Sequence, residues 1–299
     1  MSVVVIWKAI GVIAAIGILA AIVLYFISKK FHVEEDPRID MIVEFLPGAN
    51  CGGCGFAGCR NLAETMVARC TMDGCKCPGN SAENNAKIAA ILGIEAGETT
   101  PKVAVVRCQG TCENAPAKVQ YDSAFTCAFA NNLFAGENGC PNGCLGCGDC
   151  VKACNFGAIH IDEVTKLPVV DEDKCVGCGV CAKNCPRNVI EVRPKGPKGR
   201  RVYVSCNNKE KGAVAMKNCK VACIGCGKCA KACPFEAITL ENNLAYIDPT
   251  KCKMCRKCVA ECPKHAIVAV NFPAPAPKPA PEAKPEPAAE TEAVKTEAN

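Results

Sequence analysis

Aromatic residues are scarce in this chain: they make up 5% of its 299 residues, and Trp7 is the single tryptophan. So few aromatics argue against a conventional large hydrophobic core in the cysteine-rich part. Histidine is rarer still, and we read His32, His160 and His265, which are isolated from one another, as ordinary polar or packing residues. The sequence also lacks a nucleophile–base set, a glycine-rich phosphate loop and a flavin motif. These absences argue against an independent catalytic site.

Cysteine, in contrast, is abundant, with 28 copies. A disulfide scaffold would scatter them, whereas here four runs share the spacing C-x2-C-x2-C-x3-C between residues 144 and 262. Three thiolates at this spacing lie on one tight loop, and the fourth usually ligates the other cluster of a two-cluster module. Zinc knuckles use two cysteines per loop and have no use for the third. The pattern is typical of ferredoxins and predicts [4Fe-4S] clusters that transfer electrons.

The cross-over rule of two-cluster ferredoxins assigns each of these sixteen cysteines to a cluster. In the first module one cluster takes Cys144, Cys147, Cys150 and Cys185, and the other takes Cys154, Cys175, Cys178 and Cys181. In the second module the two sets are Cys223, Cys226, Cys229 and Cys262, and Cys233, Cys252, Cys255 and Cys258. Proline follows the last cysteine of three runs, and Asn155 replaces it in the first run.

The runs belong to an internal duplication. Cys127, Cys140 and the first run recur 79 residues later as Cys206, Cys219 and the third run. The second run recurs 77 residues later as the fourth. We therefore expect two tandem two-cluster modules, at residues 137–191 and 216–270, joined by a linker at 192–215.

The first 30 residues form a separate segment. Residues 3–27 are almost wholly apolar, with Lys8 the only charge, and they are long enough to cross a bilayer as one helix. No basic residue precedes this run and no A-x-A site follows it, so a retained anchor is favoured over a signal peptide. Lys29 and Lys30 place the bulk of the chain on the cytoplasmic side of the cytoplasmic (inner) membrane. The helix carries no acidic residue suited to conducting ions.

Residues 33–100 are expected to form a small helical domain with a cluster of its own. The segment GANCGGCGFAGCR supplies Cys51, Cys54 and Cys59, and Cys77 is our choice for the fourth ligand, with Cys75 as the alternative. Residues 60–69 and 81–92 read as helices, the second capped by Ser81. A zinc knuckle is the competing interpretation of these cysteines.

The connector at residues 101–136 leaves the number of clusters at five or six. Cys108, Cys112, Cys127 and Cys140 could hold a sixth cluster, but only Cys127 and Cys140 have counterparts in the duplicate. Buried free thiols are the alternative. The fold predicted overall is α+β, and the Pro/Ala-rich tail, residues 271–299, is predicted to be disordered.

The formal charge of +5 does not indicate a nucleic-acid partner. A [4Fe-4S] core held by four thiolates carries about −2, so five clusters would bring the net charge to about −5.

The chain resembles the B subunit of the Rnf family of ion-translocating ferredoxin:NAD+ oxidoreductases. The resemblance covers residues 1–270 and rests on the membrane helix, GANCGGCGFAGCR with a later Cys-Pro-Gly, VVRCQGTC, GCLGCGDCVKAC and the further ferredoxin repeats. It implies cluster ligation at Cys51, Cys54, Cys59, Cys77 and the sixteen ferredoxin cysteines. Some relatives lack a cysteine at the position of Cys147, so Cys140 could be the ligand there.

The resemblance also implies a function. The chain would accept electrons from soluble reduced ferredoxin and pass them towards NAD+, while partner subunits couple the transfer to Na+ or H+ movement. A membrane-anchored polyferredoxin that serves a different reductase, and a zinc-organised assembly protein, are the rival interpretations.

Overall fold

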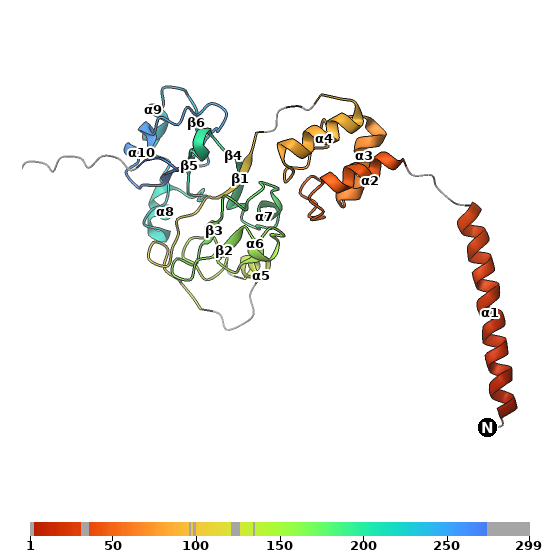
Figure 1. The fold of residues 1–299 in the computed structure, drawn as a ribbon. Coiled ribbons are helices and arrows are strands. Elements are labelled where there is room, and N and C mark those ends of the chain that lie inside the picture. The colour runs from red at the N-terminus through yellow and green to blue at the C-terminus, as the bar shows by residue number, and fades with distance from the viewer. Residues whose placement is uncertain are drawn as a thin grey trace, which may run out of the picture.

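The computed structural model describes residues 3–30, 36–95, 97, 100–120, 126–133 and 135–273. The tail predicted to be disordered lies outside the described residues from 274 onward. Helix α1, Val3–Lys30, stands apart from the rest of the chain (Figure 1). Its segment Ile10–Lys30 has a mean hydropathy of 2.8 and none of it is buried, so it is long and apolar enough to cross a membrane.

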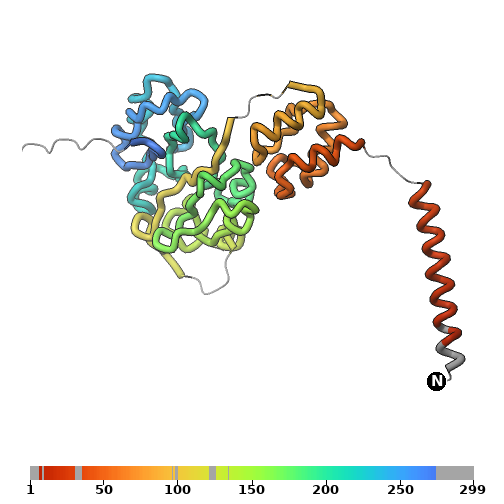
Figure 2. Tube along the Cα trace, in the orientation of Figure 1, coloured from red at the N-terminus to blue at the C-terminus, as the bar shows by residue number. Residues whose placement is uncertain are grey.

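Three helices form the unit that follows, and the trace of Figure 2 shows them grouped in orange. They are α2 (Pro37–Phe45), α3 (Cys59–Arg69) and α4 (Ala82–Leu92). Both helices predicted from the sequence are present, and the Ser81 hydroxyl caps α4 by accepting from the Asn84 N–H. Leu62, Met66 and Ile88 are fully buried between the helices. Apolar contacts, in addition to any metal, therefore hold this unit together.

The first ferredoxin module contains two β-ladders and three short helices. The helices are α5 (Cys127–Asn132), α6 (Asp149–Lys152) and α7 (Val180–Lys183). Strands β2 (Ile159–Ile161) and β3 (Pro168–Val170) form a hairpin. Strand β4 (Ile190–Pro194) pairs antiparallel with β1 (Lys102–Val106), which comes from the connector. The connector thus completes the module.

The second module repeats this plan. Strand β5 (Arg201–Val204) pairs with β8 (Ile267–Val270), and β6 (Ile238–Glu241) pairs with β7 (Leu244–Ile247). Its helices are α8 (Gly212–Asn218), α9 (Lys228–Lys231) and α10 (Lys257–Ala260), and a short 3-10 turn, η1 (Pro197–Gly199), precedes β5. β5 falls within the predicted linker, as β1 falls within the predicted connector. Each module therefore takes one strand from the segment before it.

Charged and aromatic side chains pack where the two modules meet. The carboxylate of Glu191 in β4 lies 3.4 Å from the Arg107 guanidinium and accepts a hydrogen bond of 2.8 Å from the Tyr246 hydroxyl. Arg193, which is 2% exposed, lies over the rings of Tyr203 and Tyr246. These contacts join β4 of the first module to β5 and β7 of the second, and they fix how the two modules face each other.

Candidate metal centres

The cysteine runs fold into tight loops because the residue just before each short helix has a left-handed backbone. This residue is Gly148 before α6, Gly179 before α7 and Gly227 before α9, with φ between 73° and 84°. Arg256 takes the same conformation in the fourth run, with φ of 63°. Glycine adopts this conformation at little cost, which explains its recurrence there. In the third and fourth runs, the first three thiols line one cavity.

The structure places the ferredoxin cysteines in four sets, which we name here. Set 1A contains Cys144, Cys150 and Cys185, with Cys127 and Cys147 beside them; set 1B contains Cys154, Cys175, Cys178 and Cys181. Set 2A contains Cys223, Cys226, Cys229 and Cys262, and set 2B contains Cys233, Cys252, Cys255 and Cys258.

Sets 1A, 2A and 2B each line one apolar cavity. With their open mouths, these cavities measure about 400, 380 and 310 Å³, a similar size for three similar sites. In each cavity, thiols from one run meet the last thiol of the neighbouring run, as Cys262 meets the third run in set 2A. In set 1B, Cys178 lies near Cys154 and Cys175. The chain topology thus brings thiols from two runs to one place four times.

Set 1A differs from the others because it has a surplus thiol. Cys127, at the start of α5, lines the cavity with Cys144, Cys150 and Cys185, whereas Cys147 is absent from its wall. A hydrogen bond between the thiols of Cys127 and Cys147 lowers the pKa of Cys127. The Cys147 thiol also points to the Leu145 carbonyl, 3.6 Å away. Two cysteines therefore compete for one corner of this site.

The N-terminal set, named set N, gathers around Cys77. Burial first, and then the nearby thiols of Cys54, Cys59 and Cys51, raise the pKa of Cys77 to about 11. The loop before α3 is held by Asn50, whose side-chain oxygen accepts from the Cys59 N–H at 2.8 Å.

Cys75, the alternative to Cys77, is completely buried in the core beneath the helices. The three cysteines of the glycine-rich loop lie near Cys77, and Cys54, Cys59 and Cys77 pack against the core that contains Cys75.

Buried thiols of this kind suit a cationic group. Burial raises the pKa of Cys181 and Cys258 to about 12, so at neutral pH they would stay protonated without a positive partner. Backbone N–H groups point at several sulfurs, at 3.4 Å in the cases of Cys154, Cys175 and Cys185. Iron in a cluster supplies the charge that stabilises thiolates, and N–H donors stabilise the sulfur ligands further. The donor chemistry therefore fits [4Fe-4S] clusters.

Among the residues that the structure describes, no group of three or more His, Cys, Asp or Glu side chains is placed to hold a single metal ion.

Set N lies against set 1B. A Cβ atom placed on Gly53 would lie 2.8 Å from both the Cβ and the carbonyl oxygen of Cys178. The Asn155 side chain donates a hydrogen bond of 3.2 Å to the Ala49 carbonyl, so the residue that replaces the usual proline ties the two units together. Cys51 is also among the thiols near Cys178. The helical unit is therefore docked with its metal loop facing the first ferredoxin module.

Two of the remaining cysteines, Cys70 and Cys112, are exposed. Of the four cysteines that we considered for a sixth cluster, Cys108 and Cys140 lie together, but Cys127 belongs to the cavity of set 1A and Cys112 is exposed.

Four stretches of the chain match three known iron–sulfur families. Residues 143–189 and 222–266 match one family described as "4Fe-4S dicluster domain", and residues 174–237 match another of the same description. Residues 46–77 match the family described as "Putative Fe-S cluster". The first two of these matches coincide with the two ferredoxin modules, the third spans the end of the first module and the start of the second, and the last covers the loop and cysteines of set N.

Relatives of the whole chain point to one family. This chain is 44% identical to the B subunit of the Na+-translocating ferredoxin:NAD+ oxidoreductase complex of Acetobacterium woodii. The match extends over 245 residues, which are 82% of this chain and 72% of the relative. It is 44% identical to the B subunit of the proton-translocating ferredoxin:NAD+ oxidoreductase complex of Clostridium ljungdahlii, over 81% of this chain and 84% of the relative. It is 40% identical to the B subunit of the ion-translocating oxidoreductase complex of Methanosarcina acetivorans, over 82% of this chain and 91% of the relative. The chain belongs to the family of B subunits of the ion-translocating ferredoxin:NAD+ oxidoreductases known as Rnf complexes.

Proposed function

We propose that this chain is the iron–sulfur electron-transfer component of a membrane-bound, ion-translocating oxidoreductase. It takes electrons from soluble reduced ferredoxin and passes them towards NAD+, while partner subunits move Na+ or H+. One observation carries the proposal: four cysteine sets, each with thiols from two neighbouring runs, surround sites of the same kind.

The protein holds its carriers and insulates them. Cysteines of sets N, 1A, 1B, 2A and 2B hold five [4Fe-4S] clusters, which would supply one-electron carriers when bound. Apolar side chains around the runs, such as Ile159, Ile190, Ile238 and Ile267, are buried against the cysteines and exclude water from them. The short helices keep the thiols in place. The chain's own residues therefore do no bond chemistry on the substrate.

Helix α1 anchors this assembly. Its apolar surface has no partner within the described part of the chain, and Lys29 and Lys30 lie in its last turn. Basic residues at that end favour the cytoplasmic side for the iron–sulfur domains. There they meet soluble ferredoxin, and the helix meets the membrane subunits.

Iron analysis of the full-length chain, purified anaerobically in detergent, tests the function. We expect at least about 20 irons with equal sulfide per chain, since each cluster has four of each. Addition of reduced ferredoxin should bleach the cluster absorption within the mixing time of a stopped-flow instrument. About eight irons, zinc in place of iron, or no reaction with ferredoxin would each contradict the proposal.

Set 1A should tolerate the loss of one surplus thiol. Cys127 lines the cavity, and the backbone places Cys147 as it places the middle cysteine of the other runs, so either can complete the set. We expect the Cys127→Ser and Cys147→Ser variants each to keep the wild-type iron content. The double variant should lose about four irons. Loss of a cluster in one of the single variants would identify that residue as the sole fourth ligand.

A further inference from the structure

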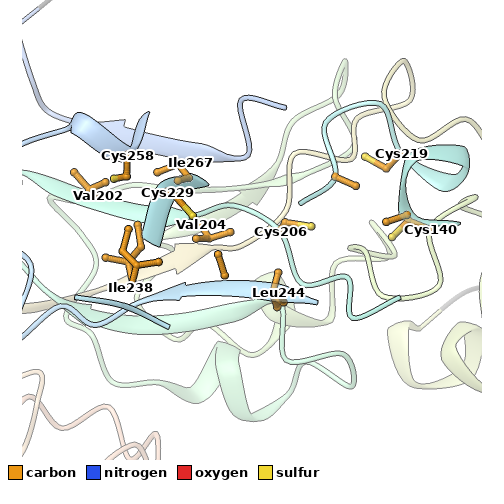
Figure 3. Close-up of a cluster of buried hydrophobic side chains, with 14 of the residues drawn as sticks. Cys140, Val202, Val204, Cys206, Cys219, Cys229, Ile238, Leu244, Cys258 and Ile267 are labelled. Atoms are coloured by element: carbon orange, nitrogen blue, oxygen red, sulfur yellow. The ribbon is translucent and has the colours of Figure 1, made fainter. Parts of the chain in front are cut away.

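Four cysteines that belong to none of the five sets lie together between the ferredoxin modules. Cys140, Cys206 and Cys219 are 6–8% exposed, and Figure 3 shows them grouped at one end of the second module's core. A Cβ atom placed on Gly143 would lie 3.5 Å from the Cys140 sulfur and 3.6 Å from the Cys108 sulfur. The Cys108 and Cys219 thiols both lie near Cys140. Cys108 is likewise among the thiols near Cys206.

Cys108 and Cys206 occupy equivalent places in the two halves. Each lies two residues beyond the strand that pairs with the last strand of its module, β1 for Cys108 and β5 for Cys206. Each sulfur accepts the backbone N–H of the residue two positions on, from Gly110 at 3.3 Å and from Asn208 at 3.5 Å. The repeat in the sequence pairs Cys127 with Cys206, but the fold puts Cys108 in that role.

The same two sulfurs contact the neighbouring ferredoxin sets. Cys108 accepts the N–H of Cys144, the first cysteine of set 1A, at 3.4 Å. Cys206 accepts the N–H of Cys223, the first cysteine of set 2A, at 3.3 Å. The group of four therefore touches both modules in the same way.

Cys140 and Cys219 form the second equivalent pair. Each precedes the first cysteine of a run by four residues, and each is close to the backbone N–H two positions on, of Asn142 and Val221 respectively. The buried Asn208 side chain donates to the Cys140 sulfur at 3.7 Å, while its backbone N–H serves Cys206. One residue thus contacts thiols contributed by both halves.

A cation lies beside each member of the second pair, Cys140 and Cys219. Arg187, 8% exposed, donates to the carbonyl oxygens of Cys140 and Gly143 at 3.3 and 2.8 Å. Lys264, at the matching position after Cys262-Pro263, is the charge near Cys219. A cluster with four thiolates carries about −2, so nearby positive charge stabilises it.

We propose that Cys108, Cys140, Cys206 and Cys219, named here the bridging set, hold a further [4Fe-4S] cluster that connects the two ferredoxin modules. Four converging thiols, backbone and amide N–H donors and two cations are the features shared with sites for such clusters. The proposal rests on the proposed function, because it assumes that sets 1A and 2A also hold clusters.

The bridging set would complete a continuous series of neighbouring cysteine sets through the protein. Set N faces set 1B, and sets 1B and 1A share a core through Cys181 and Cys150. Sets 2A and 2B share a core through Cys229 and Cys258. The bridging set contacts set 1A through Cys108 and set 2A through Cys206, on the two sides of the boundary between the modules. With it, the contacts between sets run in one order: N, 1B, 1A, bridging, 2A, 2B.

The iron content of the full-length protein tests this proposal. We expect about 24 irons and 24 sulfides per wild-type chain, and about four fewer in a Cys140→Ser/Cys219→Ser variant, which loses one thiol from each half. EPR of the reduced variant should lack the spins of one cluster. The matched control is Cys70→Ser/Cys112→Ser, which removes two exposed cysteines outside every set and should keep all its iron.

The outcomes separate this proposal from the proposed function. About 20 irons in the wild type, or unchanged iron in the Cys140→Ser/Cys219→Ser variant, would overturn the bridging cluster and leave the function standing. Zinc at about one ion per wild-type chain would overturn it too. If the Cys140→Ser/Cys219→Ser variant fails to fold, the iron content of the wild-type chain still decides.

An Asn208→Leu variant keeps all four thiols but loses the side-chain N–H donor to Cys140. We expect the midpoint potential of one cluster to become more negative in this variant.

Discussion

A chain that begins at residue 31 should keep all its iron and lose coupled NAD+ reduction completely. Every cysteine of the proposed sets lies at or beyond Cys51, and α1 has no contact within the described part of the chain that the metal loops need. The truncated protein should therefore be soluble, brown and still reducible by ferredoxin. Membrane attachment, which concentrates the protein near its partners, would be gone. The measurement is ferredoxin-dependent NAD+ reduction and ion uptake in vesicles that lack the native protein.

The control replaces residues 1–30 by an unrelated membrane-spanning helix. If attachment is the helix's whole role, this chimera should recover coupled activity; if α1 also contacts specific membrane subunits, it should stay inactive while bound to the vesicles. Loss of iron from the truncated chain would show that the helix takes part in folding the domains. Full coupled activity from the truncated chain would show that the anchor is dispensable.

The ferredoxin part of the fold could be predicted from spacing because ligand geometry restricts it so strongly. Three thiols at intervals of three need a tight loop, and the sequence contains that loop four times. The family assignment is confirmed by relatives that are 44% identical over most of the chain. The helices at residues 60–69 and 81–92 could also be predicted from the sequence, because the apolar pattern and the Ser81 cap are local signals.

What could not be predicted depends on contacts between distant residues. The repeat of 79 residues pairs Cys127 with Cys206, yet strand pairing puts Cys108 opposite Cys206 and sends Cys127 to set 1A. Spacing cannot show this, since β1 joins the first module through a ladder with β4, almost 90 residues later. Strands β1 and β5, in a predicted connector and a predicted linker, were missed for the same reason. Their short continuous runs of apolar residues, as in KVAVV and RVYV, were the available signal.

The docking of the helical unit on the first ferredoxin module could not be predicted from the sequence either. Gly53 approaches Cys178 so closely that any side chain there would meet a backbone carbonyl at 2.8 Å, which cannot move without distorting set 1B. A Gly53→Leu variant should therefore fold each unit, keep its iron and separate set N from set 1B. Overpacking of this kind costs about 1–3 kcal/mol, which lowers the equilibrium constant for docking by about 5–150-fold.

Ferredoxin-dependent NAD+ reduction by the complex should then fall by about tenfold or more if electrons pass between set N and set 1B. EPR should show the magnetic interaction between these two clusters weakened in the variant. Ala68→Leu is the control, because it adds a leucine side chain to the same unit at an exposed position of helix α3. Equal activity of the Gly53→Leu variant and the wild type, with the clusters intact, would mean that electrons reach the ferredoxin modules without using set N. In that case the contact between Gly53 and Cys178 would be structural, and the order of centres would begin at set 1B.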